Sequence, residues 1–136
     1  MTIDLPYRQI HLDFHTSIGI DDVGHEFDAD VFGDTMAQAN VNNVTLFGKC
    51  HHGLLYYGTD HEARHPGLRK GHDLLGEQIE ALHKRGIRAP IYMSAQCDEY
   101  VAQHYPQWLT VHKEESQVQT ETKSTITKLY PISAPP

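Results

Sequence analysis

A run of residues with acid–base chemistry, "KCHHG" at 49–53, directly follows the short apolar segment 44–48. Imidazole and thiolate groups are preferred zinc ligands, and a neutral imidazole also offers one hydrogen-bond donor and one acceptor, which suits sugar hydroxyls. The spacing matches none of the strong zinc signatures, such as paired CxxC or HExxH. We therefore expect hydrogen bonding to a polar ligand here, with a metal site and plain surface exposure as the alternatives.

Histidine and aspartate also alternate in the segment "HLDFH" at 11–15. Because successive side chains of a strand point to opposite faces, His11, Asp13 and His15 share one face. Asp13 and His15 lie nearest the end of this segment, where we expect them to contact substrate or metal. The alternative is an inward side chain that is bonded to a neighbouring strand.

A third polar group follows the segment 87–94 and includes Asp98 and Glu99. Glycoside hydrolysis usually needs two carboxyl groups that face one another across the substrate. Asp98 and Glu99 are adjacent, so on an extended segment they would point apart. The sequence therefore assigns no pair as acid and nucleophile.

Alternating strands and helices must position these three groups. The patterns predict strands at 8–14, 44–48 and 87–94, and helices at 27–41, 72–86 and 98–109, the last one short and stopped near Pro106. The order β-α-β-α-β implies a parallel sheet with right-handed crossovers. Ligands of such sheets bind at the C-terminal ends of the strands, where all three polar groups stand.

Two apolar stripes should face the core from the first two helices. The stripes consist of Val31, Phe32, Met36 and Ala39 in the first helix, and Leu74, Leu75, Ile79 and Leu82 in the second.

Composition limits the partners. The net charge of −7 argues against nucleic acid, and no apolar run approaches the 18 residues that would span a membrane. The first ten residues lack the features of a signal peptide, and two cysteines are too few for a disulfide scaffold. We therefore predict a cytoplasmic protein with reduced thiols.

Two regions differ in character. Residues 1–110 carry the strand and helix patterns, whereas residues 111–136 form a polar tail that we interpret as weakly ordered or non-native sequence. Three strands form either a small open α/β domain or the first part of a TIM (β/α)8 barrel, which needs about 250 residues. Open edge strands would need cover, so a homo-oligomer is one option.

Two quoted segments carry a family resemblance. "FDADVFGDTMAQANVNNVTLFGKCHHG" at 27–53 and "HPGLRKGHDLLGEQIEALHKRGIRAPIYMS" at 65–94 resemble the N-terminal part of TIM-barrel glycoside hydrolases, and the resemblance covers roughly residues 7–109. The chain is most similar to the hypothetical glycosyl hydrolases and more distantly similar to the alpha-L-fucosidases. In fucosidases the second strand ends in Lys-His-His-Asp-Gly and the third in Tyr-Tyr-Ser.

Against the fucosidase pattern, Lys49 and His51 match, whereas Cys50 replaces a histidine and His52 replaces the aspartate. Tyr92 is similar to the end of the third strand, and His15 stands where those enzymes carry a sugar-binding histidine. The resemblance implies sugar binding by His15 and His51. It also implies a nucleophilic aspartate after a fourth strand, which the sequence does not reveal, so we expect a truncated barrel that is inactive alone.

The favoured interpretation is thus the N-terminal section of a glycoside hydrolase with a carbohydrate substrate and no metal or cofactor. The alternatives are a metal-dependent TIM-barrel hydrolase and a small non-enzymatic α/β binding module. The expected substrate-binding residues are Asp13, His15, Lys49, His51, His52, Tyr92, Asp98 and Glu99.

Overall fold

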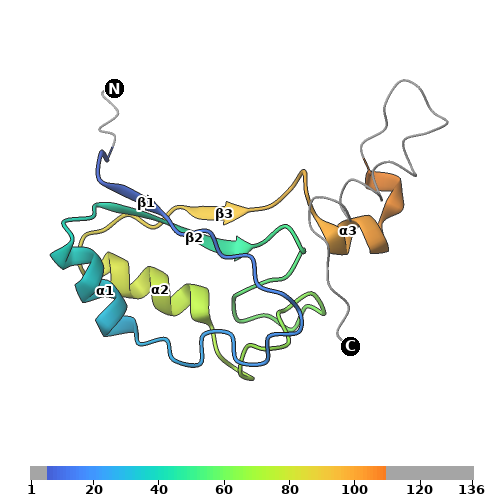
Figure 1. Ribbon diagram of the computed structural model, residues 1–136, viewed down its shortest axis with the longest axis horizontal. Helices are drawn as coiled ribbons and strands as arrows, with labels where there is room; N and C mark the ends of the chain where they lie inside the picture. Colours follow the sequence, from blue (N-terminus) through green and yellow to red (C-terminus); the bar gives the residue numbers. More distant parts are fainter. Residues whose placement is uncertain (1–5, 110–136) are drawn as a thin grey trace.

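A three-stranded parallel sheet forms the centre of the computed structural model, which describes residues 6–109 (Figure 1). The strands are β1 (Gln9–His11), β2 (Asn43–Lys49) and β3 (Ile91–Met93), in the order β1-β2-β3. Since neighbours in the sheet are also consecutive in the chain, each crossover returns to the adjacent strand. The parallel α/β arrangement predicted from the sequence is confirmed for this part of the chain.

Two helices cover one face of the sheet. Both α1 (Ala29–Gln38) and α2 (Leu74–His83) lie on the same side and pack against each other (Figure 1). The third helix, α3 (Glu99–His104), lies beyond the C-terminal end of β3 and leads into a 3-10 turn, Pro106–Trp108. The predicted stop near Pro106 is therefore confirmed.

An aspartate begins each helix. The carboxylates of Asp28, Asp73 and Asp98 accept hydrogen bonds from backbone N–H groups three residues onward, at 2.8, 3.0 and 2.9 Å. Such caps satisfy donors that a helix cannot bond internally.

The outer strands are shorter than their patterns predict. β1 covers three residues of the expected 8–14, and β3 three of the expected 87–94. Each of these strands pairs only with β2. Bonding to β2 continues irregularly on both sides of β3, through the Asn43–Arg88 bridge and the Ser94 N–H, which donates to the Lys49 carbonyl. Pro90 precedes β3 and supplies only its carbonyl, which accepts a 2.9 Å bond from the Leu46 N–H. Proline has no backbone N–H, but only the Pro90 carbonyl is used here. The residue therefore does not interrupt the hydrogen bonds between β2 and β3.

The core between sheet and helices is made of aliphatic side chains. Leu82 is fully buried, but Val31, which the stripe placed inside, is 64% exposed. Ala39 of the predicted stripe is exposed as well. The inward face of α1 is formed by Phe32 and Met36, as predicted, together with Gly33. Gly33 leaves room for the Arg85 side chain, because a Cβ at this position would lie 2.5 Å from the guanidinium. The buried members are Val41, Val44, Leu46, Leu75, Leu82 and Ile87.

A second cluster lies at the C-terminal ends of the strands and includes the loop between β2 and α2. Its buried members are Val23, Phe47, Cys50, Leu54, Tyr56, Leu68 and Leu74. Both cysteines are free thiols, with Cys50 buried and Cys97 exposed. None of the helices within residues 6–109 is long and apolar enough to cross a membrane.

Replacing Leu82 with alanine should cost about 2–5 kcal/mol of unfolding free energy, because it opens a cavity in a fully buried position. Urea denaturation measures this loss. Val31→Ala is the matched control, and it should change stability little. Equal losses in the two variants would contradict the packing described.

Candidate functional site

Aromatic rings gather on the face of the sheet that the helices leave bare. Val44 and Leu46 pack toward the helices, so alternation turns Phe47 to the opposite face. There the Phe47 ring lies 4.6 Å from Tyr92, 5.4 Å from His11 and 5.0 Å from His15, between ring centroids. The three strands therefore bring aromatic and imidazole rings onto one surface.

His15 and His51 form the polar part of this surface. Their ring centroids are 4.0 Å apart, and His15 Nδ1 accepts a 3.2 Å hydrogen bond from the His51 backbone N–H. The His15 proton therefore belongs on Nε2, which donates to Asp13 Oδ1 at 2.9 Å. Asp13 is 71% exposed, so it orients His15 from the solvent side.

Both of these histidines favour the neutral form. Burial, followed by the neighbouring His52 and His15, lowers the pKa of His51 to about 4. Burial also lowers the pKa of His15, although Asp13 opposes this. A neutral imidazole carries one donor and one acceptor. Those of His15 are both bonded within the protein, whereas Asp13, which is 71% exposed, keeps acceptor capacity for the hydroxyl groups of an uncharged ligand.

A buried ion pair connects the end of β2 to the start of α3. Lys49 Nζ donates to Asp98 Oδ2 at 2.5 Å, and Asp98 Oδ1 caps α3 through the Val101 N–H. The Asp98 side chain is only 4% exposed. Both of its oxygens bond protein groups, so its observed role is to position α3, and its contact with a ligand stays a prediction.

His52 and Glu99 form a second contact between the same two elements. His52 Nδ1 donates to Glu99 Oε2 at 3.1 Å, and the backbone N–H groups of Glu99 and Tyr100 bond the carbonyls of residues 51 and 52. Gly53 follows with φ of 81°, and a Cβ there would lie 2.4 Å from the Tyr100 Cβ. Glycine is therefore required at the end of the "KCHHG" run.

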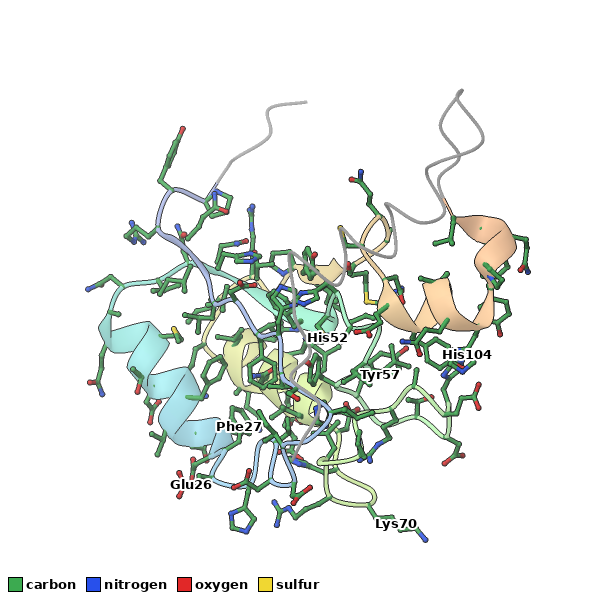
Figure 2. All side chains as sticks on the ribbon, turned by 45° about the vertical axis from the view of Figure 1, so that its right-hand side comes forward. Glu26, Phe27, His52, Tyr57, Lys70 and His104 are labelled. Carbon is green, nitrogen blue, oxygen red and sulfur yellow. The ribbon has the colours of Figure 1, made fainter. Side chains whose placement is uncertain are left out.

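The eight predicted residues fall into two adjoining groups. A ring contact of 4.1 Å between His51 and His52 joins them (His52 is labelled in Figure 2). We call the first group the ring surface: Asp13, His15, His51 and Tyr92, together with His11 and Phe47. The second group contains Lys49, His52, Asp98 and Glu99 at the start of α3.

Several residues of the region escaped sequence reasoning. Phe47 reads as an ordinary core residue, and Glu62 and Tyr100, whose side chains bond each other, lie 38 positions apart. His65, which lies in the loop after β2, is fully buried. Its ring nitrogens bond the Gly67 N–H and the Ser17 carbonyl, both at 3.0 Å. His65 therefore stabilises the loop conformation.

A metal centre finds no geometric support in residues 6–109. Nowhere in that range do three or more His, Cys, Asp or Glu side chains come together in an arrangement that could hold a metal ion.

The ring of His51 should remain neutral down to about pH 4, and NMR titration of its ring protons measures this. Because the unfolded chain binds this proton near pH 6.5, the stabilising contribution is full above pH 6.5 and is lost as the pH falls toward 4. His51→Gln should weaken the acid-dependent drop in melting temperature. His83→Gln, at an exposed position, is the control. Titration of His51 near pH 6.5 would contradict the described burial.

Comparison with known proteins identifies the family. The model of the family described as "Hypothetical glycosyl hydrolase 6" matches residues 28–133. This match continues past residue 110, where the described structure has ended. A search of curated proteins finds no match.

Solved fucosidase structures share the fold. Alpha-L-fucosidase isoenzyme 2 from Paenibacillus thiaminolyticus is 44% identical with a TM-score of 0.72, over 82% of this chain and 16% of its own. The alpha-fucosidase from Thermotoga maritima is 20% identical with a TM-score of 0.54, over 82% of this chain and 28% of its own. The alpha-L-fucosidase from Bacteroides thetaiotaomicron is 20% identical with a TM-score of 0.53, over 76% of this chain and 22% of its own.

The chain thus spans less than a third of each of these three fucosidases. The family match over residues 28–133 covers most of the chain. The chain belongs to the hypothetical glycosyl hydrolase 6 family and is a glycosyl hydrolase-like domain related to alpha-L-fucosidases.

Proposed function

We propose that this domain is the N-terminal section of a glycoside hydrolase barrel and that its ring surface binds the substrate sugar. One observation carries the proposal: the neutral imidazoles of His15 and His51 lie beside Phe47 and Tyr92, at the C-terminal ends of parallel strands. The exposed Asp13 carboxylate, which His15 orients, supplies acceptors for hydroxyl groups, and His51 lies beside it. The half-buried Tyr92 ring, packed on the buried Phe47, supplies apolar surface for a sugar ring.

Fucose is the first sugar to test. The 44% identical relative is named as an alpha-L-fucosidase, and Lys49, His51 and Gly53 match the fucosidase motif. Cys50 departs from it and is fully buried in the core, so the side chain at this position cannot reach a ligand on the ring surface. His52 departs too, and its Nδ1 bonds Glu99. We therefore propose sugar contacts by His51 first and by His52 on the adjoining side.

The open sides of the sheet support membership of a larger barrel. Within residues 6–109, β1 and β3 each pair with one neighbour only. Ile91 and Met93, which lie near Leu75 on the helix-covered side, are 48% and 49% exposed. We propose that further strand–helix units pack there and supply the nucleophile. A cytoplasmic location and a homo-oligomer stay predictions from the sequence.

Binding of L-fucose to the 136-residue chain tests the ring surface. His15→Ala should weaken binding because it frees Asp13 from the bond that orients it, and His51→Ala because it removes a polar contact with the sugar. Each loss of about 1 kcal/mol corresponds to about a fivefold change in affinity. NMR titration measures the affinities, and His83→Ala is the exposed control. Unchanged affinity in both variants would contradict sugar recognition by these imidazoles. Glucose and galactose, titrated in parallel, test the choice of sugar.

The 136-residue chain should not hydrolyse aryl alpha-L-fucosides, because the proposed nucleophile lies outside residues 6–109. Release of the aryl alcohol, followed by absorbance, measures turnover. Robust turnover that survives repurification would overturn this part of the proposal.

A further inference from the structure

A cavity of about 380 Å³ adjoins the ring surface on the side of α3. It lies between the loop after β1, the loop after β2 and the outer face of α3. His52 lines both the cavity and the junction with His51, whose ring is 4.1 Å away (Figure 2). The principal lining residues are Leu54, Ala63, Glu62, Glu99, Tyr100 and His104.

We propose that this cavity is a second sugar subsite, which binds the saccharide unit attached to the sugar on the ring surface. The inference rests on the proposed function, because it takes its first sugar from that site. The volume lies within the range of small-molecule sites, which begins at about 300 Å³. The shared boundary at His51 and His52 places the two sites within reach of adjacent units of one oligosaccharide.

The cavity has the apolar surface that a second sugar ring needs. The rings of Tyr100 and His104 stack on each other at 3.9 Å and 19°, and both residues line the cavity (His104 is labelled in Figure 2). Leu54 and Ala63 add aliphatic surface on the loop side. The C–H faces of a pyranose pack on surfaces of this kind.

Its polar groups are suited to hydroxyls. Glu99 is held by His52 Nδ1 at 3.1 Å and by Gln103 Nε2 at 3.2 Å, and Glu62 accepts from the Tyr100 hydroxyl. That bond raises the pKa of Tyr100 to about 12, so the hydroxyl keeps its proton. Each carboxylate retains acceptor capacity beyond these bonds.

The same lining disfavours other ligand classes. Two carboxylates line the cavity without any lysine or arginine among its described residues, which disfavours phosphates and other anions. Carboxylates at the wall also disfavour a wholly apolar ligand. An uncharged polyhydroxyl ligand fits both the apolar lining and the carboxylate acceptors.

Two ligands separate the sites: L-fucose, which fills one, and α-L-fucosyl-(1→2)-galactose, which fills both. In the 136-residue chain the disaccharide should bind about tenfold more tightly than fucose. Tyr100→Ala should remove this advantage, because stacking is worth about 0.5–1.5 kcal/mol, and should leave fucose affinity unchanged. Tyr100→Phe keeps the ring and should keep most of the advantage. Tyr105→Ala, outside the lining, is the matched control.

NMR on the unsubstituted chain gives a readout that does not depend on how a variant folds. The ring protons of Tyr100 and His104 should shift with the disaccharide and not with fucose, whereas His51 should respond to both. Equal affinities for the two ligands, or unshifted Tyr100 and His104 rings, would overturn the subsite and leave the proposed function standing. Failure of both sugars to bind would overturn both.

Discussion

The ion pair between Lys49 and Asp98 holds the functional end of this domain together. Burying a charged carboxylate lowers the stability of a fold unless the group is paired and hydrogen-bonded. The Asp98 side chain is 4% exposed, and it meets both conditions. Because the same carboxylate caps α3, the helix cannot turn without breaking the pair or leaving a buried charge unsatisfied. The contact of His52 with Glu99 and two backbone bonds to residues 51 and 52 reinforce this connection, and the cavity beside α3 adjoins it.

The fold was largely predictable because its signals are local. Alternation predicted the strands, the aspartates marked the helix starts, and the stripe of α2 faced inward as expected. The prediction that Val31 faces the core was wrong. Phe32, Gly33 and Met36 form the inward face of α1, and Gly33 lies against the Arg85 side chain. This contact joins residues about 50 positions apart in the sequence, so no local sequence pattern predicts it. The short lengths of β1 and β3 were likewise not visible in their local patterns.

The site was predictable in position and less so in detail. Polar residues after each strand had to meet at one edge of a parallel sheet, and His15 and His51 do meet there. Adjacent residues of one motif nevertheless lie in different environments. The Cys50 side chain is buried in the core, whereas the His51 ring is part of the ring surface. Phe47 looked like any core residue, and the bond between Glu62 and Tyr100 links a loop to a helix. Partners of this kind are set by tertiary packing.

The segment between β2 and α2 is irregular in shape but ordered in its bonding. The N–H of Leu55 bonds Ala63, that of His65 bonds Leu55, and that of Tyr56 bonds Gly48 within β2. The Tyr56 amide is therefore released only when its contact with β2 opens, so its hydrogen exchange should be slow and should follow that of the strand. The Leu55 and His65 amides bond within the segment and exchange when the segment itself opens. In kinetic terms the segment is coupled to the sheet through the Tyr56 amide, although it has no regular secondary structure of its own.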